Sequence, residues 1–455
     1  MPLELARGTI STTLNHLRSA PDISNLQERV AAQSRVDDEI KRSLMAAGHT
    51  ASDLTSLANV LLAASQDPRR QPIAFRLFEI AYGPSSLVAT FQLPAEQRQR
   101  IREEARTRAR PGDAQDAQVT QQGWWDDEAG YSWAGMILSN AAPPPPNPAH
   151  LRERHEEAIE TYRRLAERGN ANGKLGLGRL LQAQAVSGRL DAHTKDKVVQ
   201  RVLQLWREAG EAGNAEAWYE LGTVHLGGAS VAVDESEAER CFVKGADLGH
   251  AGSHYALGVL YMRLAKPVQA HEHFHAAAER GDVQSQYNLG LHYLLQPSLH
   301  LQSAALVDGS KTLHQLHEER WGVKPDDVLA RLWFERASAA HFAPALMNLA
   351  ALLHEGRGNP PPPSTSSSSS KDSVAETASG ATHLTRSQQL QYSAALYAKV
   401  VSMGSVSSSL PGSNAGGGGL ARFGLDRESA EAMVKLANEE MEKVNKALQE
   451  MQGEA

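Results

Sequence analysis

Hydrophobic residues recur at helical spacing along most of the chain. In residues 26–47 they recur near helical spacing, and a second such run covers residues 54–64. Residues 73–82 place four apolar side chains on one face, behind Pro72 at a position where a helix can begin. No stretch shows sustained alternation of β-branched and polar residues between turn signals. The pattern therefore predicts an all-α protein.

One pattern repeats five times between residues 158 and 356. In the first helix of each copy, a large hydrophobic residue is followed by a small one. These pairs are Leu177-Gly178, Leu221-Gly222, Leu257-Gly258, Leu289-Gly290 and Leu349-Ala350. Glycine inside a helix is less favourable than alanine by up to about 1 kcal/mol. Its recurrence therefore indicates a place where a neighbouring helix must approach closely.

The second helix of each copy ends at a residue that suits a left-handed helix stop. The stops are Gly169, Gly213, Gly249, Gly281 and, as a departure, His341. Seven residues before each stop stands an aromatic residue: Tyr162, Trp206, Phe242, Phe274 and Phe334. Aromatic residues make up only 5% of the chain, so we interpret this column as a packing requirement. We assign the extra residues of the longer copies to loops at 182–197 and 297–322.

These copies resemble the Sel1-like repeat, the shorter-period relative of the tetratricopeptide repeat. The resemblance rests on AEAWYELGTVHLGG at 215–228 and VQSQYNLGLHYLL at 283–295, and it covers residues 157–358. It implies a right-handed α-solenoid of stacked helix pairs that holds other polypeptides together and performs no chemistry itself. The repeated pattern is consistent with such a solenoid, because stacked helix pairs each bury one face against the next and leave a long concave surface.

The chain divides into repeats and segments of other composition. We predict N-terminal helices at 1–50, a helical region with a degenerate repeat at 51–110, a linker at 111–123, the solenoid at 124–358, a low-complexity Pro/Ser insert at 359–388, a partial last repeat at 389–404, a Gly/Ser linker at 405–420 and an amphipathic helix at 421–455. We expect the insert and the Gly/Ser linker to be disordered, because neither can bury enough apolar surface to offset its chain entropy.

The C-terminal segment has apolar residues at alternating steps of four and three. They are Ala430, Val434, Ala437, Met441, Val444, Leu448 and Met451. Two interpretations stay open: the stripe covers the last repeat as a cap, or it forms a coiled coil with a second copy or a partner. We favour the cap, because the seam is near the minimum length for a coiled coil.

Composition narrows the class of protein. A net charge of −7 over 455 residues does not indicate a nucleic-acid partner, and six arginines at 98–110 are interrupted by acids and lack interleaved aromatics. No apolar run approaches the roughly 20 residues of a membrane span. The single cysteine, Cys241, excludes an intramolecular disulfide framework. We expect a soluble, cytoplasmic protein.

Residues 1–20 loosely resemble a mitochondrial presequence, so a mitochondrial assembly factor of the same fold stays an alternative.

One motif points to catalysis. His271, Glu272 and His275 fit HExxH, in which two histidines one helical turn apart bind zinc and the glutamate activates water. The repeat explains the same residues, since Phe274 lies in the aromatic column and the inner face of that helix is needed for packing. His271 and His275 would then point outward, with no third ligand. We therefore predict no enzyme, metal or cofactor, and keep a zinc-dependent hydrolase as the rival interpretation.

Partner binding is expected along the first helices, on a stripe that follows one face of each. The candidate residues are Glu216, Tyr219, Thr223, Leu226, Tyr255, Val259, Met262, Tyr287, Leu291 and Leu294. The alternative is that the three tyrosines pack between helices instead of contacting a ligand. The predicted partners are other proteins or peptides.

Overall fold

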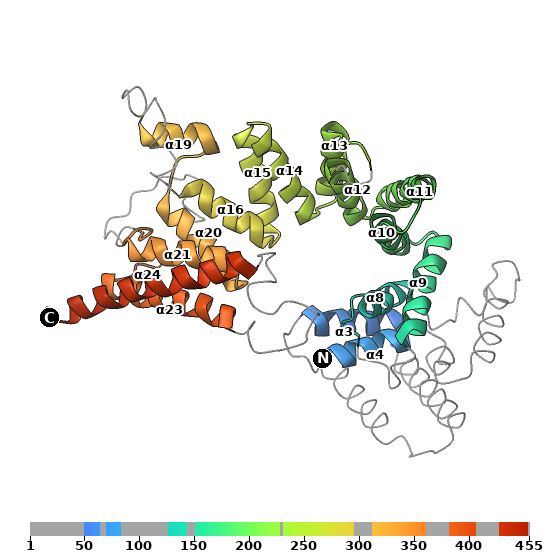
Figure 1. The fold of residues 1–455 in the computed structure, drawn as a ribbon, viewed down its shortest axis with the longest axis horizontal. Coiled ribbons are helices and arrows are strands. Elements are labelled where there is room, and N and C mark those ends of the chain that lie inside the picture. Colours follow the sequence, from blue (N-terminus) through green and yellow to red (C-terminus); the bar gives the residue numbers. More distant parts are fainter. Residues whose placement is uncertain are drawn as a thin grey trace, which may run out of the picture. The chain divides into compact units, whose positions relative to one another are not determined.

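The structure is a computed structural model that describes residues 50–63, 70–82, 126–142, 151–227, 231–294, 312–360, 382–405 and 427–453. Over these residues it contains helices and no strand (Figure 1), as the sequence predicts. The segments 1–49, 83–125, 361–381 and 406–426 lie outside the described residues. So do the predicted helices at 26–47, the arginine-rich segment and most of both low-complexity tracts.

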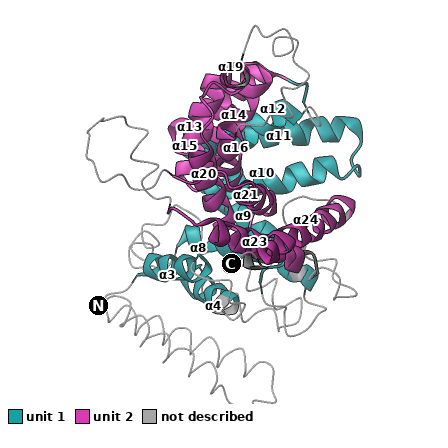
Figure 2. Ribbon diagram, turned by 90° about the vertical axis from the view of Figure 1, so that its left-hand side faces the viewer, with its two compact units in different colours: residues 1–233 teal, residues 234–455 magenta. Residues whose placement is uncertain are grey.

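The chain consists of two compact units, residues 1–233 and residues 234–455, coloured separately in Figure 2. The described helices of the first unit are α3 (Ala51–Ala63), α4 (Arg70–Tyr82), α8 (Asp127–Leu138), α9 (Leu151–Glu167), α10 (Ala171–Val186), α11 (Ala192–Glu211) and α12 (Ala215–Gly227). Those of the second are α13 (Glu235–Asp247), α14 (Ala251–Arg263), α15 (Pro267–Glu279), α16 (Val283–Tyr293), α19 (Leu313–Trp321), α20 (Asp327–Ala339), α21 (Ala343–His354), α23 (Arg386–Ser405) and α24 (Arg427–Gly453).

Tight turns join each second helix to the next first helix. The stop residue adopts a positive φ, for example +93° at Gly213 and +83° at Gly249. The following residue caps the next helix: the Asn214 side chain accepts from the Ala217 backbone N–H at 2.9 Å, and the His250 Nδ1 accepts from the Ser253 N–H at 3.1 Å. This pairing of a left-handed stop with an N-cap reverses the chain within two residues.

The small residues of the first helices meet the aromatic residues of the second helices. Gly178 lies against Trp206 in the first unit, and Gly290 lies against Phe334 in the second. The Trp206 indole N–H donates to the Leu175 carbonyl at 3.2 Å, which satisfies the polar atom of this buried ring. The two predicted columns are therefore opposite sides of one recurring contact.

Described helices extend into both predicted loops. Residues 182–197 are spanned by the end of α10 and the start of α11, which leaves only residues 187–191 between the helices. Within 297–322, residues 313–321 form α19, which begins at a capping box between Thr312 and Gln315. These helical segments were not predicted because they contain too few apolar residues to show helical periodicity.

The last repeat is formed by α21 and α23, on either side of the low-complexity insert. The Ser393 hydroxyl donates to the Ala350 carbonyl at 2.8 Å, and Tyr397 is buried at the aromatic position. Asn359 and Leu384 exchange hydrogen bonds of 2.7 and 3.1 Å, which holds the two ends of the insert together. The insert therefore leaves and re-enters the stack at one place.

The C-terminal helix α24 packs along α23 within the second unit (Figure 1). Ala437 and Val444 are fully buried in the core that α21 and α23 also line. The outward face carries Lys–Glu pairs, such as Lys443 with Glu440 at 2.7 Å. A buried stripe with a charged outer face is the form that a terminal cap of a repeat stack takes.

No helix among the described residues has the length and apolar character that crossing a membrane requires.

Candidate functional site on the first helices

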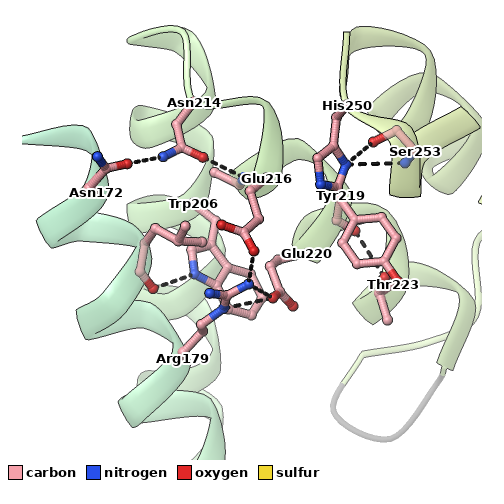
Figure 3. Close-up of polar contacts among 12 residues, drawn as sticks. Asn172, Arg179, Trp206, Asn214, Glu216, Tyr219, Glu220, Thr223, His250 and Ser253 are labelled. Atoms are coloured by element: carbon pink, nitrogen blue, oxygen red, sulfur yellow. Dashed lines mark hydrogen bonds and ion pairs between the residues drawn. The ribbon is translucent and has the colours of Figure 1, made fainter. Parts of the chain in front are cut away.

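A charged cluster lies on the first helices of the first unit. Arg179 of α10 reaches across to α12, where it bonds Glu216 at 2.6 Å and Glu220 at 2.6 and 2.8 Å (Figure 3). Burial alone would lower the pKa of Arg179, but its hydrogen bonds to the two carboxylates raise it above the ordinary value. The cluster is half-exposed, and it fixes a cation between two acids at the helix surface.

A second polar chain runs beside this cluster. The Asn172 side chain donates to Glu128 of α8 at 2.6 Å. The Asn214 side chain donates to Asn172 at 2.6 Å (Figure 3). Three successive first helices are thereby linked through their N-terminal ends. Asparagine offers a donor and an acceptor at once, which lets each residue serve two neighbours.

The predicted stripe residues of the first unit are only partly open. Glu216 is paired with Arg179, and the Thr223 hydroxyl donates to the Tyr219 carbonyl at 3.0 Å. Leu226 is half-buried, whereas Thr223 is exposed.

In the second unit, the predicted tyrosines pack between helices. The ring of Tyr255 lies 6.0 Å from that of Phe274, and the ring of Tyr287 lies 5.9 Å from Phe334 and 5.3 Å from Phe342. Burial raises the pKa of Tyr287. These contacts favour the alternative in which the tyrosines support the stack.

Val259 is the most accessible apolar member of the stripe in this unit. It is 39% exposed, and Met262, one turn further along α14, is half-buried. Leu291 of α16 and its C-cap residue Leu294 instead pack against the hydrophobic core of the unit.

The HExxH histidines do not both point outward, so that prediction is wrong for His271. Its ring stacks on that of His292 at 5.8 Å, and its Nε2 lies 3.3 Å from the Tyr293 hydroxyl. His275 packs its ring edge-on against Trp333 at 5.5 Å. The reason is that α16 packs against the side of α15 that we expected to face outward.

These imidazoles are held in their neutral form. Burial, followed by the neighbouring His275, lowers the pKa of His271 to about 4. Burial, His271 and His317 lower the pKa of His292 to about 3, and the ring of Trp321 lies 4.6 Å from that of His292. Among the described residues, no cluster of three or more histidine, cysteine, aspartate or glutamate side chains is placed to hold a metal ion. The two HExxH imidazoles have ring centroids 6.3 Å apart, and each also packs against a ring of another helix.

Sequence reasoning missed Arg179 and Glu220. Arg179 follows Gly178 directly, which is the position that Thr223, Val259 and Leu291 occupy in the other copies. If the stripe is extended to the equivalent position of the first copy, it includes Arg179. Its pairing with Glu216 and Glu220 has no such signal, because the partners are 37 and 41 residues away.

Comparisons with known proteins match part of this chain to a repeat family. A family model for the Sel1 repeat matches residues 215–250, 251–282, 283–299 and 315–341. Similar solved structures include a Sel1 repeat protein from Oxalobacter formigenes (19% identity, 51% of this chain and 80% of that chain, TM-score 0.37). Another is c5321, a protective antigen of uropathogenic Escherichia coli with an SLR fold (15% identity, 98% and 94%, TM-score 0.40). A search of curated proteins gives no match to the chain.

Proposed function

We propose that the protein, whose residues 215–299 and 315–341 match the Sel1 repeat model, is a non-catalytic scaffold that binds other proteins or peptides through its first helices. The observation that carries the proposal is the repeat itself. The pairs α10/α11, α14/α15 and α16/α20 bury their small and aromatic columns against each other, and the first helices carry residues that differ from copy to copy.

The two units offer different chemistry at this face. In the first unit, the half-exposed cluster of Arg179, Glu216 and Glu220 would recognise a polar or charged segment. In the second unit, Val259 and Met262 offer apolar contact. We propose that Val259 contacts the partner directly, whereas Tyr255 and Tyr287 shape the surface from beneath.

The test uses two valines of equal exposure in the second unit. Val259 on the first helix α14 is 39% exposed, and Val243 on the second helix α13 is 38% exposed. A partner is identified by quantitative affinity purification with the full chain, then purified, and its affinity is measured by calorimetry for wild type, Val259→Glu and Val243→Glu.

We expect Val259→Glu to weaken binding at least tenfold and Val243→Glu to leave the affinity unchanged. Both variants should fold, because both side chains already face water. Equal affinity for all three proteins, or a loss confined to Val243→Glu, would overturn the assignment of the first-helix face. If no protein binds the wild-type chain stoichiometrically, the proposal that the protein is a scaffold is overturned.

A further inference from the structure

Two histidines on neighbouring helices of the second unit point their ring nitrogens at each other. The Nδ1 atom of His254 on α14 lies 3.1 Å from the Nδ1 atom of His273 on α15. The ring centroids are 5.4 Å apart and the planes are tilted by 36°. Both side chains are partly exposed, so water and small ions have access to the nitrogens.

We propose that His254 and His273 form a two-histidine site for a divalent transition-metal ion such as Cu²⁺, Ni²⁺ or Zn²⁺, with water in the remaining coordination positions. His273 is the third residue of the HExxH sequence, but the proposed site does not use the two motif histidines, because His271 and His275 are packed against other rings. It also goes beyond the scaffold function, which needs no metal.

The spacing of the two nitrogens fits a shared ion. Two imidazole nitrogens bound to one Zn²⁺ at about 2.0–2.1 Å in a tetrahedral arrangement are about 3.3 Å apart. In the square-planar geometry that Cu²⁺ prefers, neighbouring nitrogens are about 2.9 Å apart. The 3.1 Å separation of His254 and His273 lies between these values, so small side-chain adjustments bring an ion within reach of both.

Without metal, the same two nitrogens share a proton. One neutral imidazole carries its proton on Nδ1 and donates it to the Nδ1 lone pair of the other. When an ion binds, the donor ring loses its Nδ1 proton to water and takes one up on Nε2, so that both rings carry their single proton on Nε2 and offer their Nδ1 lone pairs to the ion. Both rings therefore stay neutral, and metal binding needs no net release of a proton from them.

The surroundings hold the two rings in place. The ring of Tyr261 lies 5.4 Å from that of His273, and the Tyr261 hydroxyl donates to Glu239 at 2.7 Å, which anchors it. Supporting contacts of this kind fix the orientation of ligating rings in metal sites.

Nearby charges both oppose and favour a bound cation. Arg280 opposes positive charge at His254, and Asp247 favours it there. Glu272 favours positive charge at His273. The Arg280 guanidinium is directed at the Ala276 carbonyl of its own helix, 2.6 Å away.

The experiment titrates Cu²⁺ alone into the metal-free, full-length protein at pH 7. Electron paramagnetic resonance counts the nitrogens bound to the first equivalent, and competition with a chelator gives the dissociation constant. The same titration is made with His254→Gln, His273→Gln and the matched control His275→Gln, which removes one HExxH histidine from the same helix as His273. Circular dichroism verifies that each variant is folded.

We expect two directly bound nitrogens in wild type and in His275→Gln, and at least a tenfold higher dissociation constant in both His254→Gln and His273→Gln. Zn²⁺ should raise Tm of wild type and of the control only, since it would join α14 to α15. Unchanged affinity in the His254 and His273 variants, or a loss of affinity in His275→Gln, would overturn the site. Either result would leave the scaffold proposal untouched.

Discussion

Gly258 of α14 lies directly under the ring of Phe274 on α15: a methyl group at Gly258 would stand 2.7 Å from Cδ1 and Cε1 of that ring. Real side chains do not approach so closely without displacing a neighbour. The same relation holds between Gly178 and Trp206. The absence of a side chain at these positions therefore sets the distance between the two helices of a repeat.

Gly258→Ala should lower the free energy of unfolding by about 1–3 kcal/mol, because the added methyl group forces the Phe274 ring or the helix to move. Urea denaturation followed by circular dichroism measures the change. The matched control is Gly227→Ala in α12, where nothing lies within 4 Å of the added atom. It should be neutral or stabilising by up to about 1 kcal/mol, since alanine has the higher helix propensity. Equal effects of the two substitutions would contradict the packing argument.

The repeat contacts were predictable because their signature is local. A small residue and an aromatic residue recur at fixed distances from a helix stop, so the sequence alone predicts that both columns are packing positions. The structure adds that Gly258 lies opposite Phe274. Two other features left no such trace. Helix α19 carries few apolar residues, and without it the burial of His292 beneath Trp321 could not be foreseen. Contacts between remote residues, such as Arg179 with Glu220, depend on the completed stack.

His341 occupies the stop position that is glycine in the other copies, and it adopts a φ of +61°. A residue with a Cβ atom is disfavoured in this region by roughly 1–2 kcal/mol. His341→Gly should therefore raise the free energy of unfolding by up to about 1 kcal/mol, after allowance for the greater freedom of glycine in the unfolded chain. Thermal denaturation tests this. His341→Ala keeps the unfavourable φ and should give no gain, so a gain with alanine would assign the effect to the imidazole contacts instead.

The buried histidines of the second unit should make its stability depend on pH. The unfolded chain binds a proton on each imidazole near the ordinary pKa of 6.5, whereas the pKa of His271 is about 4 and that of His292 about 3 in the folded state. The unfolded state therefore binds more protons below pH 6.5, and stability falls as the pH is lowered from 6.5 toward 4. The loss is about 2 kcal/mol per histidine at pH 5.

Denaturation midpoints between pH 7 and pH 4.5 measure this dependence. His292→Phe keeps a flat ring beside Trp321 but cannot be protonated, so its midpoint should fall less steeply with decreasing pH than that of wild type. His193→Leu removes an exposed histidine of α11 and serves as the control. Parallel pH profiles for wild type and His292→Phe would show that His292 does not carry the effect.

The two interpretations of the C-terminal helix predict different results for one pair of substitutions. Val444 is fully buried in the core shared with α21 and α23, whereas Leu436 is 48% exposed on the same helix. If α24 is a cap, Val444→Asp buries an unpaired charge and lowers the free energy of unfolding by about 3 kcal/mol or more, while Leu436→Asp changes it by less than about 0.5 kcal/mol.

Sedimentation velocity should give the same mass for wild type and Leu436→Asp. If α24 were instead the seam of a coiled coil between copies, Val444→Asp would convert a dimer to a monomer without loss of monomer stability. We expect the first result, because the charged outer face of α24 leaves its apolar stripe a single surface to cover.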